Sequence, residues 1–278
     1  LERDPANAVA HQILIGQAVR GLDYQTAETL LQQAIRYNPQ ANTLSFRAAD
    51  LYWSMGRLQD ALVEAQRGVR LDSEWAAQHT LLGLVNLYMG QPGEALVALE
   101  RARELAGDSN QALVSASLSW AFNPNRARGL ASLNARSALA YTHLAIAYQQ
   151  LGREDDARDA LLQGWPEHAE AIERGYLADG WRGMNLALAH SSAELYGYCN
   201  APRFADAGAS EDMYRCLEEW QAESNPYLAT ALNAHVSFAA YRDEPRFKRL
   251  QETFEQQVAA AAGRYAQQAP LAAAPALD

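Results

Sequence analysis

The chain has 278 residues, of which 49% are hydrophobic, and its formal net charge is −10. This acidic balance argues against nucleic acid as a partner of this segment, because phosphate binding needs a face with an excess of Lys and Arg. No apolar run approaches the roughly 18 residues typical of a membrane-spanning helix, and no basic-then-apolar signal sequence opens the chain. We therefore expect neither a nucleic-acid contact nor a membrane span in this segment.

A fixed period organises the first part of the chain. Ala27, Ala61 and Ala95 stand 34 residues apart, and Gly56 recurs as Gly90. A period of this length is typical of helical repeat arrays. It predicts three helix pairs over Ala8–Ala41, Asn42–Trp75 and Ala76–Ser109, with helices over 9–20, 25–37, 44–55, 58–71, 78–89 and 94–105. Because Gly21 lies one residue early for the glycine between the helices, we expect a distorted first turn.

The period is interrupted after the third pair. The next matching alanine after Ala95 is Ala157, 62 residues later and six short of two periods. The spacing predicts a shortened repeat over 110–137, a bend there, and a recognisable repeat over 138–171. We therefore divide the chain into a repeat array (1–171), an irregular helical C-terminal region (172–264) and a disordered tail (265–278), with a break at Gly180–Gly183 and a loop at Asn200–Ala209 in the irregular region.

The repeats resemble the tetratricopeptide (TPR) repeat. Its pattern has a Leu-Gly pair and a Tyr on one helix, and Ala, a large apolar residue and Pro on the next; these positions are filled here by Leu82-Gly83, Tyr52, the three alanines, Leu31 and Leu99, and Pro39. The resemblance implies an all-α fold, a right-handed TPR-type α-solenoid with an irregular helical C-terminal cap.

The C-terminal region resembles a second group of proteins. Residues 211–250, and above all the turn from Tyr241 to Phe247, look like the closing segment of TPR-containing bacterial signalling regulators linked to winged-helix or adenylate-cyclase modules. Physically, Pro245 suits the first position of a helix, and Phe247 and Leu250 would cover the apolar end of the stack.

The sequence has no motif for catalysis, a cofactor or a metal. It lacks a Gly-rich phosphate loop, the HExxH and GxSxG motifs and any metal-ligand spacing. Its six histidines are scattered along the chain. We therefore expect no enzyme active site and no cofactor within these residues.

The TPR resemblance implies binding of a protein or peptide in a concave groove lined by the first helix of each repeat. The family's pattern places the following residues there: Gln12, Val19, Phe46, Asp50, Trp53, Thr80, Leu84, Tyr88, Thr142, Ile146 and Gln149. This row is apolar and aromatic with little positive charge, so it favours an apolar or amphipathic helix or an extended peptide over a terminal carboxylate. The large aromatic side chains are the candidate anchors, and packing against the neighbouring repeat is the alternative role for each residue.

Cys199 and Cys216 are the two cysteines of the chain. They are interpreted either as two small buried apolar residues or as a disulfide that would place the protein in an oxidising compartment. Without a CxxC motif, neither a zinc site nor a dithiol redox site is indicated.

The leading functional hypothesis is a protein-interaction module that forms the scaffold or the regulatory or sensor part of a larger bacterial protein. The start at Leu1 rather than methionine favours such a larger or processed protein. The alternatives are a periplasmic TPR assembly factor for polysaccharide export or pilus biogenesis, and a sensor that holds a small molecule between the array and the C-terminal region. Homo-oligomerisation is compatible with each, because an unpaired terminal helix needs a cover. The bacterial cytoplasm and the periplasm both stay open as the compartment.

Overall fold

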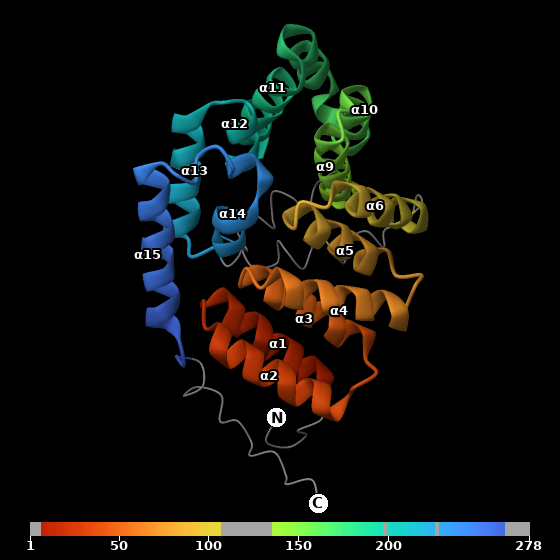
Figure 1. Ribbon diagram of the computed structural model, residues 1–278, viewed down its shortest axis with the longest axis vertical. Helices are drawn as coiled ribbons and strands as arrows, with labels where there is room; N and C mark the ends of the chain where they lie inside the picture. The colour runs from red at the N-terminus through yellow and green to blue at the C-terminus, as the bar shows by residue number, and fades with distance from the viewer. Residues whose placement is uncertain (1–6, 107–134, 197–198, 226–227, 265–278) are drawn as a thin grey trace, which may run out of the picture.

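The computed structural model describes residues 7–106, 135–196, 199–225 and 228–264 (Figure 1). Within these ranges the chain forms thirteen α-helices and no strand, which confirms the predicted all-α solenoid. Residues 110–134 of the predicted shortened repeat and the predicted tail lie outside the described residues. Four helix pairs form the array, namely α1 (Ala8–Arg20) with α2 (Tyr24–Tyr37), α3 (Asn42–Ser54) with α4 (Leu58–Leu71), α5 (Ala76–Tyr88) with α6 (Pro92–Ala106), and α9 (Ala135–Gln150) with α10 (Glu154–Gly164).

One turn geometry joins the two helices of every pair. It requires a residue with positive φ, which glycine adopts most easily, and values of 71° to 74° occur at Gly56, Gly90 and Gly152. In the first pair Leu22 takes this position, with a φ of 59°. The backbone N–H of Asp23 still donates to the carbonyl of Ala18 at 2.9 Å, as in the other pairs. The predicted distortion at Gly21 is therefore wrong: the turn is regular, and Leu22 adopts the left-handed conformation.

After the array, a short 3₁₀ helix η2 (Pro166–His168) leads into α11 (Ala169–Tyr196). This helix is interrupted at Asp179 and Gly180, where the backbone leaves helical geometry. The predicted break is thus present, but Gly183 itself lies inside the helix. A Cβ added to Gly175 would lie 2.3 Å from the carbonyl oxygen of Gly183. The two halves of α11 therefore cross in backbone contact, which only glycine allows.

The predicted loop at Asn200–Ala209 is wrong, because most of it is the short helix α12 (Ala201–Asp206). The side chain of Asn200 caps this helix by accepting from the backbone N–H of Arg203. A turn at Gly208 (φ 70°) then leads into α13 (Ser210–Ala222), and it has the hydrogen-bond pattern of the turns in the array. Leu217 follows Gly208 by nine residues, as Leu99 follows Gly90. The C-terminal region thus contains a further helical hairpin with the turn of the array.

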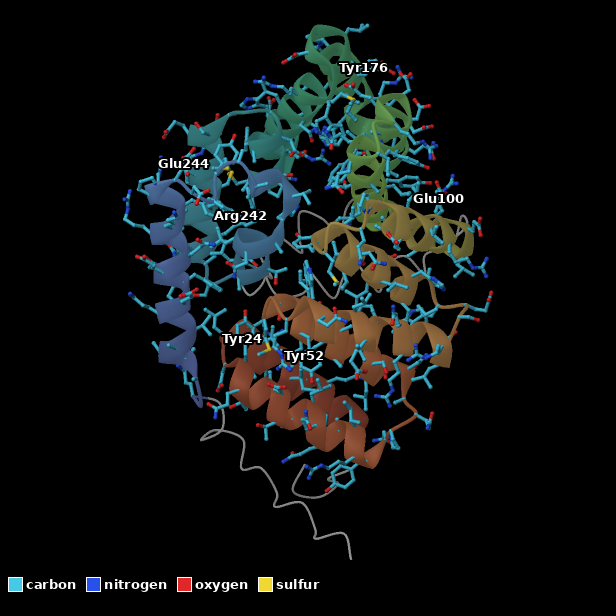
Figure 2. The ribbon with its side chains drawn as sticks, viewed as in Figure 1. Tyr24, Tyr52, Glu100, Tyr176, Arg242 and Glu244 are labelled. Carbon is cyan, nitrogen blue, oxygen red and sulfur yellow. A yellow bond between two sulfur atoms is a disulfide. The ribbon has the colours of Figure 1, made fainter. Side chains whose placement is uncertain are left out.

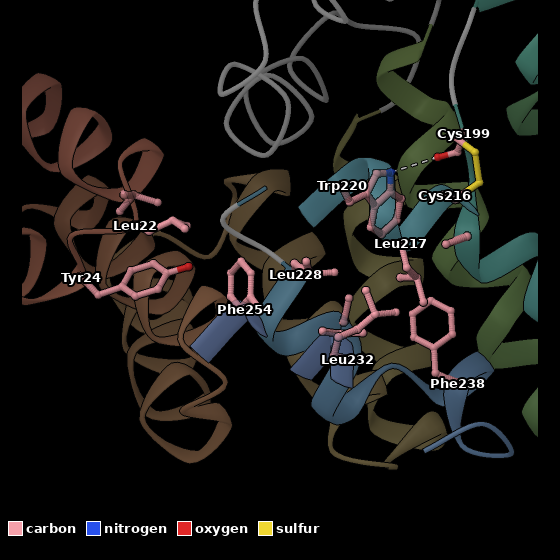
Figure 3. Packing of buried hydrophobic residues seen from close by; sticks show 14 of the residues in the cluster. Leu22, Tyr24, Cys199, Cys216, Leu217, Trp220, Leu228, Leu232, Phe238 and Phe254 are labelled. Atoms are coloured by element: carbon pink, nitrogen blue, oxygen red, sulfur yellow. Dashed lines mark hydrogen bonds between the residues drawn. A yellow bond between two sulfur atoms is a disulfide. The ribbon is translucent and has the colours of Figure 1, made fainter. Parts of the chain in front are cut away.

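The last helices return to the beginning of the array (Figure 1). They are α14 (Leu228–Ala234), the 3₁₀ helix η3 (Val236–Phe238) and α15 (Pro245–Ala261), which begins with the predicted proline. One hydrophobic cluster contains Leu22 and Tyr24 of the first pair together with Trp220 and Phe254 of the C-terminal region (Figure 3). The backbone N–H of Gly263 also donates to the Asp23 carboxylate at 2.9 Å. The solenoid is therefore closed on itself.

Candidate functional site

Most of the residues predicted to line the concave groove are buried. Seven of the eleven have exposed fractions of 8% or less: Val19, Phe46, Asp50, Trp53, Thr80, Leu84 and Ile146. Gln12, Tyr88 and Thr142 are half-buried, and Gln149 is exposed. Burial on this scale means that few of these side chains are accessible to a partner in the closed chain.

Part of the cover over the predicted groove comes from α14 and η3. The hydroxyl of Thr230 donates to the carbonyl of Trp53 and accepts from the N–H of Gly56 at 3.1 Å. The ring of His235 meets that of Tyr88 edge-on, with centroids 5.1 Å apart. The ring of Tyr88 in turn lies edge-on to Trp53 at 5.4 Å. Two of the predicted anchors are therefore already in contact with the chain's own C-terminal region or with each other.

The predicted groove residue on α9 is also engaged. The hydroxyl of Thr142 accepts from the indole N–H of Trp165 at 3.1 Å and from the guanidinium of Arg203 at 3.0 Å. Arg203 is buried and donates to the side chain of Asn185 at 2.9 Å. This polar network ties α9, α11 and α12 together, so its polar groups are used in holding the fold.

Burial makes the neutral forms of two titratable groups at this junction more favourable than they are in water. Burial lowers the pKa of His235 to about 3, and the nearby positive charge of Arg242 acts in the same direction. Burial also raises the pKa of Asp206 to about 6, despite the charge of Arg203. In the described part of the chain, no group of three or more His, Cys, Asp or Glu side chains is arranged to hold a metal ion. The junction therefore has the character of a packed polar core.

In a different arrangement, an aromatic ring, an arginine and a carboxylate join neighbouring helix pairs. The guanidinium of Arg57 lies 4.4 Å from the ring centroid of Tyr52, the residue labelled in Figure 2. The Arg57 side chain also donates to Asp60 at 2.7 Å and to Glu28 of the preceding pair at 2.8 Å. We call this arrangement a Tyr–Arg staple.

The fourth pair repeats the staple in the same register. Arg153 lies over the ring of Tyr148 at 4.5 Å and donates to Asp156 at 2.7 Å. The hydroxyl of Tyr148 donates to Glu100 on α6, which Figure 2 labels. Relative to the turn glycine, the tyrosine is four residues before, the arginine one after and the carboxylate four after in both staples.

The third pair lacks the staple, and a groove is present there. Asn86 and Gln91 take the places of the tyrosine and the arginine, whereas Glu94 keeps the carboxylate. An open groove of about 710 Å³ runs between α4 and α6 over α5. This α4–α6 groove is lined by Leu62, Gln66, His79, Leu82, Asn86, Gln91, Glu94, Val97, Ala98 and Arg101. Sequence analysis missed this site, although the change of Tyr and Arg to Asn and Gln in one repeat was a readable signal.

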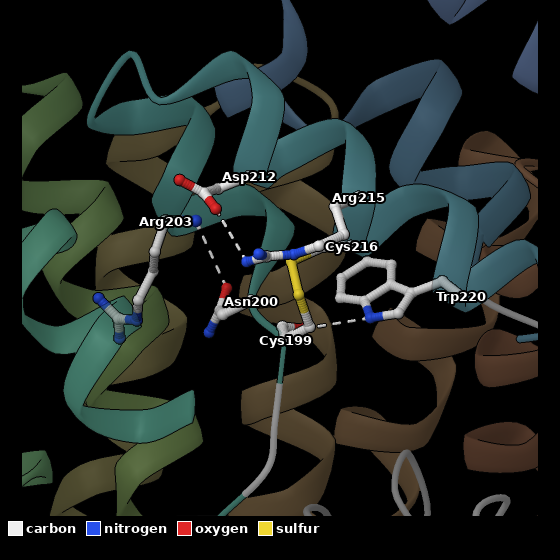
Figure 4. Close-up of a disulfide and its surroundings, with 7 residues drawn as sticks. All are labelled: Cys199, Asn200, Arg203, Asp212, Arg215, Cys216 and Trp220. Atoms are coloured by element: carbon white, nitrogen blue, oxygen red, sulfur yellow. Dashed lines mark hydrogen bonds and ion pairs between the residues drawn. A yellow bond between two sulfur atoms is a disulfide. The ribbon is translucent and has the colours of Figure 1, made fainter. Parts of the chain in front are cut away.

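The two cysteines form a disulfide that links the segment before α12 to α13 (Figure 4). Their Cα atoms lie 5.3 Å apart, and both residues are buried. The indole N–H of Trp220 donates to the carbonyl of Cys199 at 3.2 Å. The disulfide thus fixes the start of the α12–α13 hairpin within the hydrophobic cluster that closes the chain.

Paired helices joined by one recurring turn define the class of helical-repeat proteins, which present extended surfaces to other molecules. Residues 22–85 match the tetratricopeptide repeat family. This stretch is therefore similar to TPR repeats, and repeats of this family generally mediate protein–protein interaction. A search of curated proteins gave no match. None of the described helices combines the length and apolar character that crossing a bilayer requires.

Proposed function

We propose that this chain is a protein-interaction module, the scaffold or regulatory part of a larger bacterial protein, and that its partner binds the α4–α6 groove. The observation that supports this proposal is the contrast between the two surfaces. Most predicted concave residues are buried, whereas Val97 in the groove has an exposed fraction of 73%. Val97 lies there together with the apolar side chains of Leu62 and Leu82, and apolar side chains that gather at one place on a surface favour protein binding.

Binding of a helix or extended peptide in the concave groove is the alternative. Such a ligand would have to displace α14 and η3 from Trp53 and Tyr88. It would also have to replace the two hydrogen bonds of Thr230, because a buried backbone group left without a partner costs about 1–3 kcal/mol. The α4–α6 groove needs no such displacement.

The disulfide favours a second, more specific function, a periplasmic assembly factor for polysaccharide export or pilus biogenesis. Disulfides persist in oxidising compartments such as the periplasm and are rare in the cytoplasm. The test is a mass-spectrometric count of free thiols in protein isolated from its own cells under acid quench. Two free thiols at Cys199 and Cys216 would contradict an envelope function.

Affinity capture combined with cross-linking tests the binding proposal. The wild-type chain is compared with Val97→Glu, which places a charge in the groove at an exposed position. Ile13→Glu is the matched control, because Ile13 is an apolar residue of α1 with an exposed fraction of 55%. We expect a partner that cross-links to α4 or α6, is lost with Val97→Glu and is retained with Ile13→Glu. Equal capture by all three proteins would contradict the proposal.

A further inference from the structure

We propose that the α4–α6 groove binds a partner segment presenting an aromatic side chain beside an arginine, so that the partner supplies the pair that the third repeat lacks. This inference rests on the proposed function, because it assumes that a partner occupies the groove. It goes further by naming the chemistry of that partner.

The groove lies at the position that the staples occupy in their own repeats. In the second and fourth pairs, the corresponding crevice carries the ring and guanidinium of a Tyr–Arg staple. In the third pair the shorter side chains of Asn86 and Gln91 line the groove instead. Because the repeats share one backbone turn, the groove of the third pair lies where the tyrosine ring and the guanidinium lie in the two staples.

The groove has an apolar wall where the second pair has a carboxylate. Glu28, which accepts from Arg57 in the second pair, has Leu62 as its counterpart 34 residues later. Together with Leu82 and Val97, this leucine gives the groove apolar walls. An aromatic ring buries a large apolar area at low cost in conformational entropy, so it is the side chain that suits such walls.

The charges of the groove favour a cationic ligand. Glu94 stands where Asp60 and Asp156 pair with the arginines of the staples, and it takes part in no ion pair among the described residues. Arg101, the cation on the rim, is already paired with Glu74 at 3.1 Å and Glu104 at 3.2 Å. The groove therefore offers one uncompensated carboxylate. This carboxylate and the net charge of −10 both favour a partner with a cationic group over one with an acidic group.

Guanidinium is the cation that matches this arrangement best. It stacks on aromatic faces and at the same time donates to a carboxylate, which an ammonium group does less well. Both interactions occur together in the staples of this chain. A partner with the pair would therefore reproduce an arrangement that these repeats already form internally.

Selection from a phage-displayed library of random peptides tests the inference on the intact chain. The decisive variant is Asn86→Tyr/Gln91→Arg, which builds a staple into the third pair and fills the groove. We expect wild-type protein to enrich peptides with an aromatic residue next to arginine. Their affinity should fall about tenfold or more on the filled variant. A melting temperature at or above that of wild type would show that the variant is folded.

A second comparison isolates the carboxylate and does not depend on the filled variant. Glu94→Gln should weaken the selected peptides by about three- to fivefold, the upper part of the range for an exposed ion pair. Asp156→Asn, which removes the same charge from an existing staple, should leave their affinity unchanged. Equal effects of the two substitutions would overturn the inference.

The remaining outcomes separate the inference from the proposed function. Peptides that are lost with Val97→Glu but lack an aromatic–arginine pair would overturn the inference and leave groove binding intact. Peptides that bind the filled variant as well as wild type would overturn it too. A selection without any peptide that depends on Val97 would count against both.

Discussion

Removal of the disulfide should destabilise the closed C-terminal region by an amount that follows from the chain it encloses. The bond joins residues 17 positions apart. Closing a loop of this length in the unfolded chain corresponds to about 3 kcal/mol at 25 °C in the chain-entropy treatment. We therefore expect the double variant Cys199→Ala/Cys216→Ala to lose about 3 kcal/mol of unfolding free energy.

Guanidinium denaturation, followed by circular dichroism and tryptophan fluorescence, measures this loss. Trp220 lies in the affected cluster and donates to Cys199, so its fluorescence should report the C-terminal transition. Wild-type protein in dithiothreitol should show a similar loss, and the double variant should be insensitive to the reductant. A loss below about 1 kcal/mol in the variant would refute the reasoning that the bond acts by restricting the unfolded chain.

Three further predictions concern pH, the first turn and the crossing of α11. The contribution of Asp206 to stability is lost as pH rises through its pKa of about 6. The contribution of His235 is lost as pH falls from 6.5, the ordinary pKa of histidine, towards about 3, its pKa in the folded chain. Where these pH ranges overlap, the two groups change the free energy of unfolding in opposite directions. With Asp206→Asn, urea denaturation should show the unfolding free energy falling by about 1.4 kcal/mol per pH unit on acidification from about pH 6 to 4, and a flat profile would contradict this. Leu22→Gly relieves about 1–2 kcal/mol of left-handed strain but removes a buried side chain worth about 3–5 kcal/mol, so denaturation should show a net loss of about 2 kcal/mol; a gain would show that strain dominates. Gly175→Ala places a Cβ against a backbone carbonyl and should lower stability by about 2 kcal/mol, whereas Gly93→Ala, with open space around it, should be neutral or stabilising; equal melting temperatures would argue against the close crossing.

The first six helices could be predicted from the sequence because the residues that define each repeat lie within that repeat. The 34-residue spacing of small residues such as Ala27 and Ala61 fixes which helix faces approach closely, and this needs only local contacts. The hairpin at Gly208 was missed because its first helix, α12, has six residues and the turn glycine falls out of the period. Its hydrogen bonds match those of the other turns, and only the three-dimensional structure shows them.

The cover over the predicted concave residues could not be predicted in the same way. The contact between Thr230 and Trp53 spans 177 positions of the chain, and no repeat pattern encodes which element returns to the first helices. The repeat pattern does indicate that Trp53 and Leu84 contact another element. It does not indicate whether that element belongs to a partner or to the chain itself. The α4–α6 groove, by contrast, depends on Asn86 and Gln91. The sequence alone shows that these residues replace the tyrosine and the arginine found 34 positions earlier, at Tyr52 and Arg57.

A methyl NMR titration of the intact chain tests most directly where and what the repeats bind. The ligand is N-acetyl-Arg-Tyr-amide, with N-acetyl-Glu-Tyr-amide as the control of opposite charge. Binding in the α4–α6 groove predicts shifts of the methyl signals of Leu62, Leu82 and Val97 with the first peptide and smaller shifts with the second. Shifts at the buried Leu84 and Ile146 instead, or equal shifts with both peptides, would contradict the account.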